Sequence, residues 1–140
     1  MKSIIIADSS ALFSLLIETD SNYKRAIAIS KRFTNLKALI IIPTEVFTEL
    51  INVLGKKFNH DAAIEATTLI LDSKIFNIEN SEEEMRNKAL EKFKKVPKSV
   101  SYTDCLIMAF ADHFETKEIF GFDEVFHKNG YIRLGIDKTE

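Results

Sequence analysis

Two aspartates directly follow short apolar runs that are typical of buried strands. Asp8 comes after Ile4–Ala7, and Asp123 comes after Ile119–Phe122. Parallel sheets gather their functional sites at the carboxyl ends of their strands. Each aspartate also has an ordinary structural role open to it, because Asp caps helices and forms turns well. We expect both carboxylates at one edge of a sheet, where they could bind a cation.

A third acid, Glu49, lies on a predicted helix. It follows Val46 by three residues and precedes Val53 by four, so it borders the apolar stripe of that helix. A carboxylate in such a place is costly unless it is paired or binds a cation. Glu45, one turn earlier, competes for this role, although a negative charge near a helix N-terminus is favourable for structural reasons alone.

The fourth acid, Asp104, stands at the start of a helix that is apolar on all sides. The segment Ser101–Asp104 matches a capping box, which is a structural alternative to metal binding. The run Cys105–Ala111 indicates a buried helix whose amino end is held at the sheet edge. The two roles are compatible because a carboxylate has two oxygens.

Four close carboxylates would raise one another's pKa values unless a cation lay between them. Hard oxygen ligands suit Mg²⁺ or Mn²⁺, whereas three scattered histidines and a single cysteine do not favour zinc. We expect a site that activates water for hydrolysis. Its predicted metal ligands and catalytic residues are Asp8, Glu49, Asp104 and Asp123, with Ser9 holding a ligand or a phosphate oxygen beside them.

Apolar runs that alternate with helical patterns predict the elements that position these acids. Strands are expected at Ile4–Ala7, Leu39–Ile42, Ile75–Ile78, Glu118–Phe122 and Tyr131–Leu134. Helices are expected at about 9–18, 21–33, 44–54, 61–72, 81–96 and 101–114. The expected N-caps include Ser9 or Ser10, Asp61 and Ser81, and Gly55 is expected to end its helix. This alternation predicts an α/β fold with a mainly parallel sheet of four to five strands.

The length of 140 residues predicts one domain, residues 1–140, and 46% apolar residues suffice for a core without disulfides. The 19 basic and 21 acidic residues give a net charge of −2, so no global basic field indicates nucleic acid. A bound divalent ion could supply positive charge locally. The lysines between Lys92 and Lys98 could touch phosphate, but a solvated helix face is the alternative interpretation.

The single cysteine, Cys105, is expected to be a small buried hydrophobe in a protein of a reducing compartment. Neither a signal peptide nor an apolar stretch of about 20 residues is evident. We therefore expect a cytoplasmic protein without a membrane partner.

Four motifs, in this order, resemble those of PIN-domain ribonucleases of the kind found as toxins in bacterial and archaeal toxin–antitoxin pairs. The motifs are Ile4–Ser10, Ile41–Pro43 with Thr48–Asn52, Ser101–Ala109 and Gly121–Phe126. The resemblance covers nearly the whole chain. It implies a three-layer α/β/α sandwich, Mg²⁺- or Mn²⁺-dependent cleavage of single-stranded RNA, a protein antitoxin and a homodimer. One position departs from the pattern, because Gly121 stands where the family commonly has Thr or Ser.

Two other functions remain open at this stage. A catalytically silent RNA- or protein-binding domain of the same fold would be consistent with Gly121. A phosphoacceptor signalling domain also places Asp at strand ends, but such domains usually show an acidic pair after the first strand. Here Asp8 is followed by Ser9 and Ser10.

Overall fold

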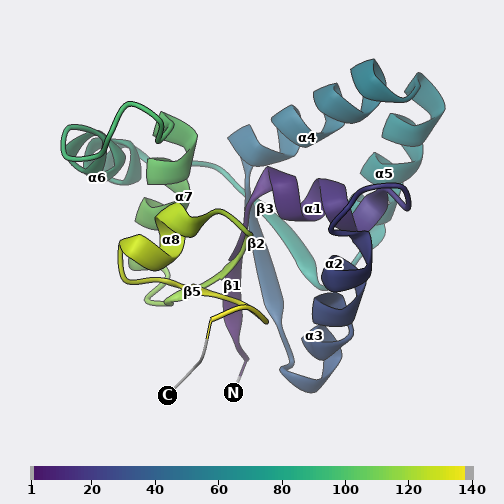
Figure 1. Ribbon diagram of the computed structural model, residues 1–140, viewed down its shortest axis with the longest axis horizontal. Coiled ribbons are helices and arrows are strands. Elements are labelled where there is room, and N and C mark those ends of the chain that lie inside the picture. The colour runs from purple at the N-terminus through teal and green to yellow at the C-terminus, as the bar shows by residue number, and fades with distance from the viewer. Residues whose placement is uncertain (1, 138–140) are drawn as a thin grey trace.

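A computed structural model describes residues 2–137 and shows a sheet in which all neighbouring strands are parallel (Figure 1). The strands are β1 (Ile4–Ala7), β2 (Leu39–Pro43), β3 (Phe76–Glu79), β4 (Glu118–Phe120) and β5 (Ile132–Arg133). Their order in the sheet is β3-β2-β1-β4-β5. All five predicted strands are present, although β4 ends two residues earlier than expected. The expected domain of residues 1–140 extends beyond the described residues at both ends.

Helices cover both faces of this sheet. They are α1 (Ser9–Leu16), α2 (Tyr23–Ser30), α3 (Arg32–Asn35), α4 (Thr44–Lys57), α5 (His60–Asp72), α6 (Glu83–Phe93), α7 (Tyr102–His113) and α8 (Glu124–Lys128). In Figure 1, α1 to α5 lie on one side of the sheet and α6 to α8 on the other. The predicted α/β/α sandwich with a parallel sheet is thus confirmed.

The core lies between the central strands and their helices. Ile5 and Ile6 of β1 and Ile40 of β2 are completely buried, as expected for strands covered on both faces. Helix α7 is buried along its whole apolar run, and Cys105 lies within it. Burial also raises the pKa of the Cys105 thiol, so the prediction of a structural cysteine is confirmed.

The strand order creates a topological switch point between β1 and β4. From β1 the chain proceeds to β2 and β3 on one side, and it then returns to β4 and β5 on the other. In open parallel sheets the crevice at such a point, outside the carboxyl ends of the strands, is the usual place for a ligand. Asp8 follows one of these two strands, and Gly121–Asp123 follows the other.

Two predicted helix boundaries are wrong, the start of α5 and the end of α4. The cap of α5 is Asn59, whose side chain accepts from the Ala62 N–H at 2.7 Å, rather than Asp61. Gly55 lies inside α4 and not at its end, and it faces Ala63 of α5.

Two further helices differ from the predicted pattern. The segment predicted as one helix from 21 to 33 is divided into α2 and α3 around Lys31. Helix α6 begins at Glu83 without a side-chain cap, so the predicted N-cap at Ser81 is absent. Within residues 2–137 no helix is both long and apolar enough to cross a bilayer.

Candidate active site

Asp8 lies at the centre of the switch point and is 7% exposed. Its backbone N–H donates to the Phe120 carbonyl at 2.9 Å, which ties the end of β1 to the end of β4. Asp8 occupies the N-cap position of α1, but its side chain makes no cap bond. The Ser10 hydroxyl instead donates to Asp8 Oδ2 at 2.6 Å. The prediction that Ser9 or Ser10 caps α1 is therefore wrong, and Ser10 has a contact at the site that the sequence pattern did not indicate.

The surroundings of Asp8 disfavour its negative charge. Burial raises the pKa of its carboxyl to about 6, against the opposing effect of the Ser10 hydrogen bond. The negative charges of Asp104 and Glu49 raise this pKa further. Three of the predicted site residues are therefore close enough for their charges to interact.

Glu49 projects from α4 toward the start of α1. The Ser9 hydroxyl donates to its Oε2 at 3.2 Å. Glu49 is exposed rather than half-buried at an apolar stripe, so the burial argument that selected it from the sequence does not apply. Its place at the site comes from this contact with Ser9 and from its effect on Asp8.

Glu45, the competing residue, is directed elsewhere. The Ser81 hydroxyl donates to Glu45 Oε2 at 2.7 Å, in the connection between β3 and α6. This contact also explains why Ser81 does not cap α6. Of the two glutamates on α4, Glu49 is thus the one whose charge affects Asp8.

Asp104 is held at the N-terminus of α7 by the predicted capping box. Its N–H donates to Ser101 Oγ at 3.0 Å, and the Ser101 N–H donates to Asp104 Oδ2 at 3.1 Å. Partial burial raises the pKa of Asp104, the Ser101 contacts oppose this, and the charge of Asp123 adds to the rise. The cap therefore fixes one oxygen of Asp104 beside the other acids.

Asp123 is exposed and caps α8. Its Oδ1 accepts from the Val125 N–H at 3.0 Å, so the predicted turn role is observed. The residue before it is held from the C-terminal side, because Arg133 Nη1 donates to the Phe122 carbonyl at 3.0 Å. The same guanidinium donates to both carboxylate oxygens of Asp137, at 3.0 and 2.9 Å. The sequence pattern did not indicate this support of the Asp123 turn.

Gly121 lies directly against Asp8. A Cβ atom at this position would be 2.9 Å from Phe126 Cε2, 3.1 Å from Asp8 Cβ and 3.3 Å from Ile119 Cγ2. A larger residue would need its neighbours to move. The glycine that departs from the family pattern therefore lies in a closely packed place beneath the acidic site.

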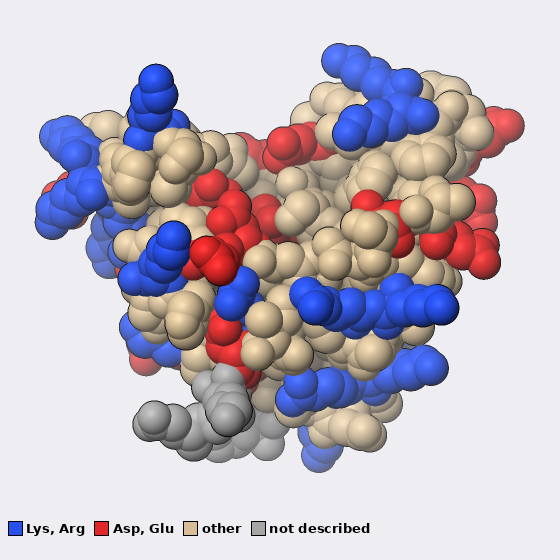
Figure 2. Space-filling view, viewed as in Figure 1, with Lys and Arg blue, Asp and Glu red and all other residues tan. Residues whose placement is uncertain are grey.

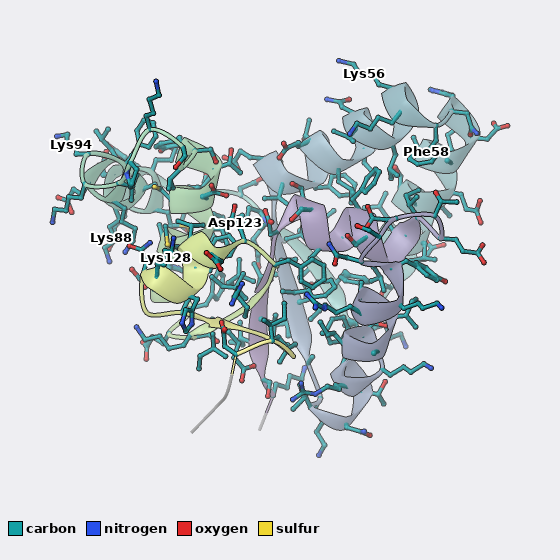
Figure 3. The ribbon with its side chains drawn as sticks, in the orientation of Figure 1. Lys56, Phe58, Lys88, Lys94, Asp123 and Lys128 are labelled. Carbon is teal, nitrogen blue, oxygen red and sulfur yellow. The ribbon has the colours of Figure 1, made fainter. Side chains whose placement is uncertain are left out.

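The acids surround a hollow between two raised arms of the molecule. Figure 2 shows acidic side chains around this hollow and basic side chains on the outer parts of both arms. Figure 3 shows Lys56 on the arm formed by α4 and α5, Lys94 on the arm of α6, and Asp123 between them. Lys92, in contrast, pairs with Asp112 at 2.8 Å and donates to the Tyr131 hydroxyl at 3.2 Å. Lys92 therefore has a structural partner, and the expectation that it contacts phosphate is not supported.

The oxygen atoms of the four acids suit a hard cation, but the four side chains do not converge on one point. Within residues 2–137 no three His, Cys, Asp or Glu side chains are close enough together to hold an ion as they stand. Each of the four acids has one carboxylate oxygen anchored by a hydroxyl or a backbone N–H, which leaves its second oxygen to turn toward a cation. A bound cation would reduce the repulsion between Asp8 and the neighbouring carboxylates.

Comparison with known proteins agrees with this architecture. The family model of the PIN domain matches residues 5–130. The crystal structure of Mycobacterium tuberculosis VapC20, described as a sarcin–ricin loop cleaving toxin, matches with a TM-score of 0.80 and 19% sequence identity. The match covers 94% of this chain and 98% of VapC20. Among curated proteins, no sequence matches significantly. The chain belongs to the PIN domain family.

Proposed function

We propose that this protein is a Mg²⁺- or Mn²⁺-dependent endoribonuclease that hydrolyses phosphodiester bonds in single-stranded RNA. The observation that carries the proposal is the buried Asp8 carboxylate at the switch point of a PIN-family sheet, with Glu49 directed toward it by Ser9. Buried carboxylates with a raised pKa next to like charges are typical of functional sites. Membership of the PIN family favours a nuclease over a phosphoacceptor domain.

Asp8, Glu49 and Asp104 would hold the ion, directly or through water. Asp123, whose charge raises the pKa of Asp104, would bind a second ion or orient a water molecule. A bound Mg²⁺ or Mn²⁺ would supply a water of lowered pKa and neutralise charge that develops on the phosphate oxygens.

The neighbouring groups position these ligands. Ser10 orients the Asp8 carboxylate, Ser9 orients Glu49, and the Ser101 cap orients Asp104. Side-chain nucleophiles are not required for this reaction, and the only cysteine is buried.

The proposal is tested by incubating labelled single-stranded RNA with wild type and with Asp8→Asn in Mg²⁺, Mn²⁺ or EDTA. We expect cleavage by wild type with either metal, none in EDTA and none by Asp8→Asn. Circular dichroism should show an unchanged fold for the variant. Cleavage by Asp8→Asn at the wild-type rate would show that the proposed site is wrong.

The biological setting that we propose is a cytoplasmic toxin with a protein antitoxin, acting as a homodimer. Two exposed apolar side chains on one face of α5 support a protein interface, since Ile64 and Leu71 are 52% and 62% exposed. Sedimentation of the purified chain would test the dimer. Co-purification with the product of an adjacent small gene would test the antitoxin.

A catalytically silent binding domain is the alternative function. It is favoured by the present separation of the acidic side chains within residues 2–137. Such a domain would bind single-stranded RNA or a protein partner but would show no metal-dependent turnover in the same assay.

A further inference from the structure

A cavity of about 540 Å³ opens beside the proposed catalytic edge. It is formed by α1, by the connection between α1 and α2, by α4 and by the turn that precedes α8. Ser9 and Asp123 lie among its lining residues, so the cavity is continuous with the acidic site. Its size falls within the range of small-ligand pockets. The proposed hydrolysis of a phosphodiester does not itself require such a space.

Two phenylalanine rings in the lining are fixed by their neighbours. Phe122 meets Phe120 edge to face at 6.2 Å, and the Arg25 guanidinium lies 5.9 Å from its ring centroid. Phe13 packs against Phe58 at 5.8 Å. Both lining rings are partly exposed. Fixed, partly exposed rings are suited to stacking with a flat aromatic ligand, and unpaired nucleobases are such ligands.

The polar part of the lining is built around Asp20. The Ser14 hydroxyl, which is only 4% exposed, donates to Asp20 Oδ2 at 2.7 Å, and the Asn22 N–H donates to the same oxygen at 2.9 Å. These two bonds fix the carboxylate while Oδ1 takes no side-chain or backbone bond within the described part of the chain. The Asn22 amide likewise makes no hydrogen bond there. The cavity thus contains a fixed acceptor beside an amide that can both donate and accept.

We propose that this cavity binds the base of a nucleotide next to the scissile phosphate, and that it prefers guanine. This inference rests on the proposed ribonuclease function. The Watson–Crick edge of guanine carries two adjacent N–H donors and one carbonyl acceptor. Asp20 would accept from the N–H groups, Asn22 would donate to the carbonyl, and Phe122 or Phe13 would stack on the ring. The negative charge of Asp20 disfavours phosphate beside it, and Lys57, whose ammonium lies 5.8 Å from the Phe13 ring centroid in the same lining, would bind the RNA backbone.

A binding experiment tests the cavity without depending on catalysis. Each of the four nucleoside 5′-monophosphates, with ribose 5-phosphate as a control, is titrated into the isotope-labelled protein in EDTA. We expect GMP to shift the backbone amide signals of Ser14, Asn22 and Phe122 more than the other nucleotides do, and ribose 5-phosphate to leave them unchanged. Equal shifts with ribose 5-phosphate, or no shifts with GMP, would overturn the proposal.

Variants then connect the cavity to RNA cleavage. Asn22→Ala should raise KM for a guanine-containing oligonucleotide about tenfold with little change in kcat, and Asp20→Asn should abolish the preference for guanine. Asn35→Ala, at the exposed end of α3, is the matched control and should behave as wild type. Thermal melting confirms that each variant is folded.

The outcomes separate this inference from the proposed function. If wild type cleaves RNA but Asn22→Ala and Asp20→Asn keep its base preference, the cavity proposal is wrong and the ribonuclease proposal stands. If GMP binds as described but wild type cleaves no RNA, the ribonuclease proposal is wrong and base binding by the cavity stands.

Discussion

The Ser9 hydroxyl donates to Glu49 Oε2 at 3.2 Å, which joins the first residue of α1 to the middle of α4 across 40 positions of sequence. Ser9 directly follows Asp8, so this one contact sets the direction of a glutamate relative to the central aspartate. Glu49 is exposed, and an exposed side chain otherwise samples many rotamers. The hydroxyl therefore restricts Glu49 to the side of the hollow where its charge reaches Asp8.

Replacing Ser9 with Ala should weaken the proposed metal site without unfolding the protein. The variant loses one partly exposed hydrogen bond, so stability should change little. Loss of a group that orients a metal ligand typically costs roughly 10–100-fold in metal affinity or activity. We expect the Mn²⁺ concentration for half-maximal RNA cleavage to rise by about tenfold. Ser30→Ala, whose hydroxyl contacts only the Ile27 carbonyl of its own helix, is the control and should leave the metal titration unchanged.

The two glutamates of α4 should behave differently when each is neutralised. Glu49→Gln removes a carboxylate that we propose as a metal ligand, so we expect cleavage to fall by at least tenfold. Glu45→Gln alters a side chain held by Ser81 and should retain near wild-type cleavage. Parallel rate measurements at saturating Mg²⁺ check both variants. If the two variants lost cleavage equally, the assignment of Glu49 as the metal ligand from α4 would be wrong.

The sequence predicted the sheet and the approximate place of the acids because these depend on local patterns. Continuous apolar runs such as Ile4–Ala7 indicate buried strands, and the acid that follows such a strand must lie at the sheet edge. The capping box at Ser101 was also predicted correctly, since all its partners lie within four residues.

Several of the features that were missed depend on contacts between distant segments. Ser81 was predicted as a helix cap from its local pattern, but Glu45, far away in sequence, binds its hydroxyl instead. The base-sized cavity likewise brings Ser14, Asp20 and Phe122 together from separate elements. Such contacts have no periodic signature in the sequence. They follow from the strand order, which brings the segments after β2 and β3 together, and from the packing of α1 against α4.

Replacing Gly121 with a larger residue should displace Asp8 and so disturb the proposed active site. An added Cβ would lie 3.1 Å from Asp8 Cβ and 2.9 Å from the Phe126 ring, so one of these must shift. We expect Gly121→Ala to lower the melting temperature by several degrees and to reduce cleavage more than tenfold, because overpacking in a core costs about 1–3 kcal/mol. Gly55→Ala, inside α4, where an added Cβ would lie 3.8 Å from Ala63 Cβ, tests whether loss of any glycine has this effect. Wild-type cleavage by Gly121→Ala would mean that Asp8 tolerates the displacement.

The buried charge of Asp8 should reduce the stability of the metal-free protein at neutral pH. The folded-state pKa of about 6 lies above the ordinary value of 3.8, so ionisation is costlier in the folded state. Stability in EDTA should therefore fall as pH rises from about 4 through 6, by up to about 3 kcal/mol. Asp8→Asn should remove this fall and should be more stable than wild type at pH 7.5 but not at pH 4. Urea unfolding at the two pH values checks this, and a lower stability of Asp8→Asn at pH 7.5 would contradict it.

Asp137 should have the opposite pH dependence, because its charge is favoured in the folded protein. The two bonds from Arg133 hold the pKa of this carboxyl at about 2, below its ordinary value of 3.8. A depressed pKa contributes stability that is complete above pH 4 and is lost as pH falls toward 2. Arg133 also holds the Phe122 carbonyl next to Asp123, so Asp137→Asn should loosen the site as well as the fold. We expect this variant to lose part of the acid-dependent change in melting temperature between pH 4 and 2 and to cleave RNA more slowly at pH 7.5. Neutralising Glu84, which forms an exposed pair with Lys88 on α6, should do neither.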